Sequence, residues 1–192
     1  LHDATAMAYA LRHGEVAVIG VGGGKDVLTA LAAGNTGVLG VEINPVFVDL
    51  LEHRYRDFAH VADQPQVELV VDEARSYFTR SQRRFDIIQA SLIDTWAATG
   101  AGAFSLSENA IYTVEAWRVF LDRLKPDGVF TVSRWFAPGR LDETVRLVSL
   151  AVAALFAEGA EHPGRHLLLG AHDEVATLLV SRRPFGKDDI AA

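Results

Sequence analysis

The segment 16–26, VAVIGVGGGKD, constrains the fold of this chain more than any other feature of the sequence. An apolar run rich in β-branched residues enters a glycine cluster, and an Ala/Leu-rich helical pattern follows it. One helix length later, a second apolar run, VLGVEIN at 38–44, contains the carboxylate of Glu42. This order predicts two buried parallel strands joined by a helix, with the glycine turn and Glu42 at the same edge of the sheet.

The glycine turn and Glu42 together indicate a nucleoside site. Glycine permits positive φ and a close approach of ligand to backbone, while the amides of a helix start supply donors. A carboxylate at the tip of the second strand accepts hydrogen bonds from ribose hydroxyls in such folds. Lys25 stands where the dinucleotide pattern G-x-G-x-x-G has its third glycine, which argues against NAD and favours a ligand such as S-adenosylmethionine. A tight turn without a ligand remains the alternative for the glycines alone.

Composition narrows the class of protein. A chain of 192 residues with 49% hydrophobic residues is long enough for one domain, which we place at 1–192. The absence of cysteine excludes disulfides and thiolate chemistry, and a net charge of -7 argues against nucleic-acid binding and is compatible with a cationic substrate. No apolar run is long enough for a membrane span. Because the chain begins with Leu1, we expect a cytoplasmic domain cut from a longer protein, and a parent that is attached to membrane segments is one of the alternatives.

Strand and helix patterns alternate along the chain and predict an α/β fold. The pair of runs HLLLGA and VATLLVSR is separated by His172, Asp173 and Glu174, a link that permits an antiparallel hairpin and is too short for a crossover. A parallel sheet that ends in such a hairpin is the Rossmann-like class I methyltransferase arrangement rather than the dehydrogenase one. Strands are predicted at 16–20, 37–42, 67–71, 85–90 and 128–133, and helices at 25–33, 45–59, 73–80, 108–124 and 141–157.

The ends of the third and fourth strands are expected to supply further site residues. Asp72, with Glu73 beside it, follows the third strand and is a candidate for contact with an adenine amino group, or else an acid in the first turn of the next helix. The segment 91–107 after the fourth strand has the length of a lid, and Asp94 is its only carboxylate. Asp94 is therefore the candidate base or cation anchor. His162 and His166 have a metal-like spacing without a carboxylate cluster, so we expect surface histidines and no metal.

From His2 to about Trp135 the sequence resembles the spermidine synthase family of aminopropyltransferases, and in particular the related domains attached to membrane segments. The resemblance is carried by VIGVGGGKDVLTAL, VEINPVFVDLL, VDEAR, FDIIQASLIDTWAATGAGAF, SENAIYTVEAWRVF and LKPDGVF. It implies that Gly20 and Gly22 lie along the methionine-derived chain, Glu42 holds the ribose and Asp72 holds the adenine. It further implies that Asp94 is the second acid of the D-x-x-D loop motif and that His2 contacts the polyamine.

Three departures from the family pattern concern the acceptor side. Ser91 stands in place of the aspartate credited with deprotonating the amine, Gly23 in place of an amine-anchoring aspartate, and Leu1 in place of a tyrosine. The family's small amino-terminal β-domain has no counterpart within these 192 residues. A serine without a nearby base does not take a proton from an ammonium group at neutral pH, so we expect little aminopropyl transfer to putrescine.

The function hypotheses differ in what happens to the bound nucleoside. The first is a transferase that uses S-adenosylmethionine or its decarboxylated form to alkylate a small-molecule amine, with a polyamine as one candidate acceptor and with Ser91 and Asp94 as its catalytic residues. Methyl transfer is the runner-up reaction, and a nucleoside-sensing domain without turnover is the alternative from another class. A homodimer is possible in either case. Because Glu42 would serve only the cleft, the sequence predicts that Glu42→Ala hardly changes folding.

Overall fold

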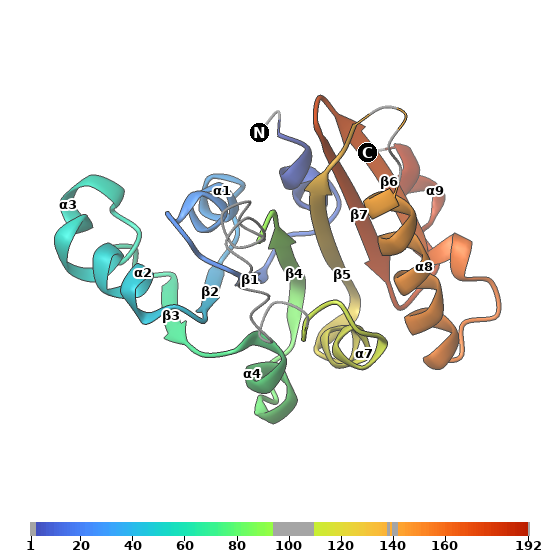
Figure 1. Ribbon diagram of the computed structural model, residues 1–192, viewed down its shortest axis with the longest axis horizontal. Coiled ribbons are helices and arrows are strands. Elements are labelled where there is room, and N and C mark those ends of the chain that lie inside the picture. Colours follow the sequence, from blue (N-terminus) through green and yellow to red (C-terminus); the bar gives the residue numbers. More distant parts are fainter. Residues whose placement is uncertain (1–2, 94–109, 138, 140–141, 192) are drawn as a thin grey trace.

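The computed structural model describes residues 3–93, 110–137, 139 and 142–191. These residues form a seven-stranded sheet with the strand order β3-β2-β1-β4-β5-β7-β6, which confirms the predicted α/β fold (Figure 1). Strands β1 to β5 are parallel to one another, whereas β7 is antiparallel to both β5 and β6. The strands are β1 Glu15–Ile19, β2 Gly37–Glu42, β3 Val67–Val71, β4 Phe85–Ser91, β5 Leu124–Trp135, β6 Leu167–His172 and β7 Val175–Ser181.

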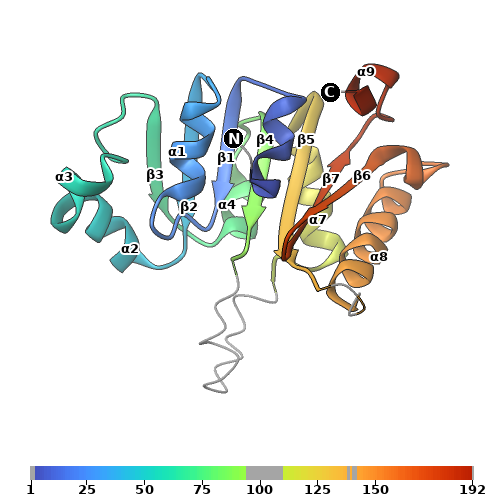
Figure 2. The ribbon, with the colours of Figure 1, turned by 90° about the horizontal axis from the view of Figure 1, so that it is seen from above.

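Helices cover both faces of the sheet, so the fold has three layers (Figures 1 and 2). One face carries α4 (Ala74–Arg80), α7 (Val114–Asp122) and α8 (Asp142–Ala157). The other face carries the 3₁₀ helix η1 (Ala4–Ala10), α1 (Lys25–Ala32) and the helical segment that starts at α2 (Pro45–Asp49). Two short helices, η3 (Pro163–His166) and α9 (Lys187–Ala191), lie beside the terminal hairpin.

The terminal hairpin is the feature that separates this fold from the dehydrogenase type. Strands β6 and β7 pair in antiparallel register from Leu167↔Val180 to His172↔Val175, and only Asp173 and Glu174 connect them. Asp173 adopts a positive φ of 51°, which lets so short a connection reverse the chain. The predicted hairpin at this edge of a parallel sheet is confirmed.

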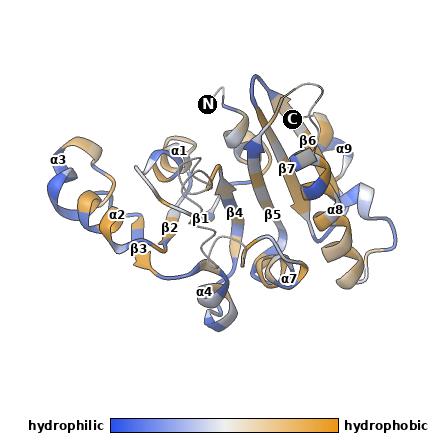
Figure 3. Ribbon diagram, viewed as in Figure 1, coloured by the Kyte–Doolittle hydropathy of each residue, from blue (hydrophilic) through white to orange (hydrophobic). Residues whose placement is uncertain are grey.

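The apolar core is divided by the sheet into two halves. On the α4–α7–α8 side, Trp117 packs edge-on against Phe130 with ring centroids 5.0 Å apart, and Phe78 contacts Phe120 in the same way at 5.4 Å. Edge-to-face pairs of this kind add about 0.5–1.5 kcal/mol beyond the area that they bury. In Figure 3 the buried strand β7 is hydrophobic over most of its length, whereas helices alternate between polar and apolar stretches. Amphipathic helices therefore enclose an apolar sheet.

The structure differs from the sequence prediction at several places. The single helix expected at 45–59 is divided into α2, a π-helical turn η2 (Leu50–Arg54) and α3 (Arg56–Ala59), because Tyr55 leaves helical geometry and its N–H donates to the carbonyl of Leu50 at 2.7 Å. The turn expected at Pro126-Asp127-Gly128 lies within β5, where the pairing with β4 shifts between Phe85 and Ile87. The preceding helix ends earlier than expected, at Asp122.

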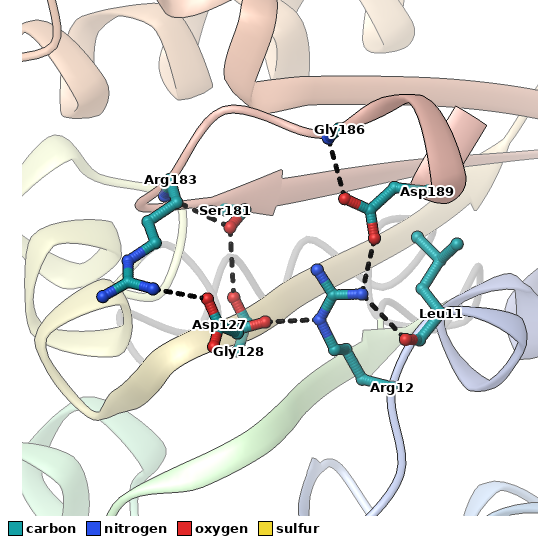
Figure 4. Close-up of polar contacts among 8 residues, drawn as sticks. All are labelled: Leu11, Arg12, Asp127, Gly128, Ser181, Arg183, Gly186 and Asp189. Atoms are coloured by element: carbon teal, nitrogen blue, oxygen red, sulfur yellow. Dashed lines mark hydrogen bonds and ion pairs between the residues drawn. The ribbon is translucent and has the colours of Figure 1, made fainter.

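The segment just before β1 contacts α9 and the start of β5 at the amino-terminal edge of the parallel strands (Figure 4). Arg12, just before β1, forms an ion pair with Asp189 of α9 at 2.6 Å and donates to the carbonyl of Asp127 at 2.5 Å. Arg183, just after β7, pairs with the Asp127 side chain at 2.7 Å. This group of charges ties α9 to the sheet at the edge opposite the glycine turn.

Among the described residues, no helix is long and apolar enough to cross a membrane.

Candidate functional site

A cavity of about 480 Å³ opens at the carboxyl ends of the parallel strands, a volume in the range of small-molecule sites. It lies beside the point where the strand order reverses between β1 and β4, which is where open α/β sheets bind ligands. The structure brings most of the sequence-predicted site residues to this cavity. Those that line it are Gly20, Gly22, Gly23, Glu42, Asp72, Glu73 and Ser91.

The glycine loop has the backbone geometry of a close-approach turn. Gly20 and Gly24 have φ of 78° and 85°, and a Cβ on them would lie 2.1 Å from Ile93 and 2.5 Å from Val61. Gly22 has φ of 51°, but a Cβ on Gly22 or Gly23 would meet no atom within 4 Å. Gly20 and Gly24 are therefore fixed by packing and conformation, whereas Gly22 and Gly23 leave open space beside the loop.

Glu42 ends β2 as a buried carboxylate that joins two loops. Its Oε2 accepts a hydrogen bond from the Gly22 amide at 3.0 Å, and its Oε1 accepts one from the Asn44 amide at 2.9 Å. The residue is only 5% exposed, yet it lines the cavity. Each carboxylate oxygen has a second lone pair, so both can still accept a bond from a ligand hydroxyl. The geometry gives Glu42 a structural contribution as well, which contradicts the expectation that it serves only the cleft.

Asp72 and Glu73 also reach the cavity, but protein partners occupy both carboxylates. Asp72 accepts from the Glu73 amide at 2.8 Å and forms an ion pair with Arg80. Glu73 is the N-cap of α4, where its two oxygens accept the amides of Arg75 and Ser76, each at 2.8 Å. The alternative that placed an acid at the start of this helix therefore describes Glu73 better than Asp72.

Ser91, the last residue of β4, belongs to a polar chain that extends into the core. The Tyr9 hydroxyl donates to the amide oxygen of Gln89, and the Gln89 nitrogen donates to the Ser91 hydroxyl at 2.8 Å. Gln89 is fully buried. The next residue, Leu92, has a φ of 49°, an uncommon conformation for a residue with a side chain that is often found beside functional sites. The hydrogen bonds from Tyr9 through Gln89 thus position Ser91 at the carboxyl end of β4.

Sequence reasoning missed Asp26, which lies in the first turn of α1 and lines the same cavity. It is only 9% exposed, and burial raises the pKa of its carboxyl group. The hydrogen bond from Ser91 and the charge of Lys25 act in the opposite direction. The available signal was an acid directly after the glycine cluster at a helix start.

Apolar wall residues were missed as well. Ile43, 50% exposed, and Phe47, 42% exposed, line the cavity next to Glu42, and Ile93 and Ile111 line it elsewhere. Large exposed apolar side chains beside a polar anchor are typical of ligand sites. Ile43 follows Glu42 directly, so its position after the strand tip was the signal in the sequence.

Some predicted residues lie outside the described part of the chain. These are His2 and Asp94, together with all but the first three residues of the expected lid. Within the described residues, no group of three or more His, Cys, Asp or Glu side chains is placed to hold a metal ion. His166 was expected at the surface, but it is buried, with its Nδ1 3.0 Å from the carbonyl oxygen of Ser181. It therefore packs against the hairpin.

The comparisons with known proteins agree with this architecture. No family model matches the chain. Among solved structures, spermidine synthase from Thermotoga maritima is similar with a TM-score of 0.67 at 17% identity, over 96% of this chain and 59% of that one. A spermidine synthase in complex with the transition state analogue AdoDATO gives 0.65 at 17% identity, over 96% and 58%. Human methyltransferase-like protein 13, in complex with SAH, gives 0.64 at 12% identity, over 98% and 82%.

These likenesses show the fold, which is that of the class I methyltransferases, shared by spermidine synthase and by several methyltransferases. The chain spans less than two thirds of the length of the spermidine synthases that it resembles.

Proposed function

We propose that this chain is a transferase that binds S-adenosylmethionine or its decarboxylated form and alkylates an amine-type acceptor. The observation that carries the proposal is Glu42, a buried carboxylate whose two oxygens are held by the amides of Gly22 and Asn44 at the wall of the cavity. This fixed pair of acceptors fits the two hydroxyls of a ribose. The similar solved structures include one bound to SAH and one bound to AdoDATO.

The rest of the cavity supports the same ligand class. The space beside Gly22 and Gly23, which a Cβ would enter without contact, suits a chain that passes close to the backbone. Ile43 and Phe47 offer apolar surface for a flat base next to Glu42. A sulfonium donor would supply the activated alkyl group, so the protein mainly has to align acceptor and donor.

Aminopropyl transfer is the preferred reaction because the sequence motifs resemble spermidine synthase along most of the chain, and methyl transfer is the competing one. Ser91, His2 and Asp94 remain the proposed acceptor-side residues. A homodimer, a polyamine acceptor, attachment to membrane segments and a cytoplasmic location are further parts of this proposal.

Calorimetric titration with S-adenosylmethionine, its decarboxylated form and methylthioadenosine tests the nucleoside site. We expect all three to bind, and product formation with amine acceptors then distinguishes aminopropyl from methyl transfer by the nucleoside that is released. Nucleoside binding without any product would instead favour a sensing domain. Failure of all three nucleosides to bind the folded chain would refute the proposal.

A further inference from the structure

Among the described acids of the cavity, Asp26 is the one that has only the side-chain hydrogen bonds from Ser91 and Gln89 and no role in the nucleoside assignment. The acids that line the cavity in the described part of the chain are Asp26, Glu42, Asp72 and Glu73. Backbone amides hold Glu42, Arg80 pairs with Asp72, and the start of α4 occupies Glu73. Asp26 has no ion pair with any described Lys or Arg side chain, because the nearby Lys25 pairs with Asp3.

Asp26 is a buried carboxylate whose charged form has no paired cation among the described residues. Taking a carboxylate out of water without a paired cation is costly, and burial accordingly raises its pKa. Ser91 and Gln89 on β4 and Lys25 on α1 favour the charged form, whereas Asp3, before η1, opposes it. Tyr9 of η1 also faces this group, and burial followed by the charge of Asp26 raises the Tyr9 pKa, so the phenol stays neutral.

The neighbours of Asp26 define the part of the cavity that its carboxylate faces. It lines the cavity together with Ser91 and the glycine loop, and the chain of hydrogen bonds from Tyr9 through Gln89 holds Ser91 in place. The carboxylate comes from the first turn of α1, whereas the amine-anchoring aspartate of the resembled family belongs to the glycine loop itself, at the position of Gly23. A positive group that entered here would meet one buried negative charge.

We propose that Asp26 binds a primary ammonium group of a ligand. The inference rests on the proposed function and specifies the charge of the substrate at that site. The ammonium group has two possible sources, the acceptor amine or the aminopropyl tail of a decarboxylated donor. A single carboxylate recognises a single ammonium group, so n-butylamine and putrescine should bind to a similar degree, and neutral 1-butanol should bind far more weakly.

Calorimetry on the intact chain and on Asp26→Asn tests this inference in two arms. The acceptor arm titrates n-butylamine, putrescine or 1-butanol, with and without saturating methylthioadenosine. The donor arm compares decarboxylated S-adenosylmethionine with methylthioadenosine, which lacks the ammonium group. Asp57→Asn, an exposed acid on α3 outside the cavity, is the matched control because it removes the same charge.

We expect Asp26→Asn to weaken ammonium binding at least about tenfold in one arm, the loss expected of one charge-assisted hydrogen bond, while methylthioadenosine affinity and the Asp57→Asn control stay unchanged. The arm that changes identifies the source of the ammonium group. The inference is wrong if the intact chain shows no preference for ammonium over neutral ligands, or if Asp26→Asn keeps that preference. If methylthioadenosine does not bind at all, the proposed function fails, and the amine titrations without nucleoside still decide the role of Asp26.

A pH series on the intact chain covers the case in which Asp26→Asn does not fold. The preference for ammonium ligands should disappear as the pH falls through the Asp26 pKa, because the protonated carboxyl group carries no charge. In Ser91→Ala this loss should begin at higher pH, since Ser91 favours the charged form. A preference that is constant across the pH series would overturn the inference.

Discussion

Glu42 contributes to the fold and also belongs to the proposed ribose site. Its carboxylate accepts the amides of Gly22 and Asn44, which belong to different loops, and it still faces the cavity. Truncation therefore removes two loop hydrogen bonds in addition to any bond to a ribose. The buried position explains why the sequence alone underestimated its structural contribution.

Glu42→Ala should weaken binding of S-adenosyl nucleosides by about one to three orders of magnitude, because hydrogen bonds to a charged acceptor contribute about 1.5–3 kcal/mol each. It should also lower the free energy of unfolding by about 1–2 kcal/mol, near the low end for unsatisfied amides since the cavity admits water. Calorimetry and urea unfolding measure the two effects. Glu174→Ala, an exposed acid at the hairpin turn, is the control. Unchanged nucleoside affinity in folded Glu42→Ala would refute the ribose assignment.

Substitution of Asp26 by Asn should raise the stability of the fold, whereas Glu42→Ala should lower it. Its pKa is raised in the folded state, chiefly by burial, so its stability contribution is greatest below the unfolded pKa and is lost as the pH rises through the folded value. Asp26→Asn should therefore raise the melting temperature of the ligand-free chain at neutral pH, and the difference from the parent should vanish near pH 3. Thermal unfolding at several pH values checks this. A melting temperature that falls at pH 7 would mean that the charged carboxylate stabilises the fold.

At the scale of elements, helix α4 depends on an unusual N-cap. Glu73 is longer than the usual Ser, Thr, Asp or Asn, and its two oxygens accept the amides of Arg75 and Ser76 separately. The same side chain lines the cavity. Its predicted contact with the cofactor therefore competes with a role that the helix already needs.

Glu73→Ala should lower the free energy of unfolding by about 0.5–2 kcal/mol, the usual cost of a lost N-cap, while nucleoside affinity stays close to that of the parent. Glu73→Asp, a preferred capping residue, should restore most of the stability. Chemical unfolding and calorimetry on the same two variants separate the roles. A stable Glu73→Asp protein with much weaker nucleoside binding would show instead that the carboxylate contacts the ligand.

The elements that could be predicted from the sequence are those with a strong local pattern. The strand at 67–71 was predicted with the bounds of β3, and the short link between the last two runs was sufficient for the hairpin. The break at Tyr55 was missed, because no Pro or Gly marks it in the sequence and a π-helical turn keeps this part of the chain helical. Pro126-Asp127-Gly128 has turn composition, but its pairing with β4 is a tertiary contact.

The site residues also fall into those that a local sequence pattern reveals and those that depend on tertiary contacts. Gly20, Gly22 and Glu42 were found because strand ends and glycine turns are visible in a sequence. Asp26 was missed because its significance comes from burial beside Ser91, a residue of a distant strand. The occupation of Asp72 by Arg80 likewise depends on side-chain positions. Local patterns thus locate the edge of the sheet where the cavity lies, and tertiary contacts determine which acids there have protein partners.

At the scale of the whole molecule, the two edges of the parallel sheet carry different features. The carboxyl edge holds the cavity, whereas the amino edge holds the charges that connect Arg12, just before β1, with α9 (Figure 4). Asp189 of α9 accepts from Arg12 at 2.6 Å and from the Gly186 amide at 2.8 Å. These two bonds, chiefly the one from Arg12, lower the pKa of Asp189.

A depressed folded pKa makes the contribution of Asp189 to stability present above its unfolded pKa, about 3.9, and lost as the pH falls through the lower folded value. Asp189→Asn should therefore lower the free energy of unfolding by about 0.2–1 kcal/mol at pH 7, the range for partly exposed ion pairs. The difference from the parent should shrink below about pH 4, since the parent carboxylate then becomes protonated as well.

Urea unfolding at pH 7, 5 and 3 measures this difference, with Asp188→Asn, the exposed neighbour in α9, as the control of equal charge. Nucleoside binding should not change in either variant, because both positions lie at the edge of the sheet opposite the cavity. If the parent and Asp189→Asn lose stability in parallel from pH 5 to pH 3, the contact between α9 and Arg12 is not what makes this edge sensitive to acid.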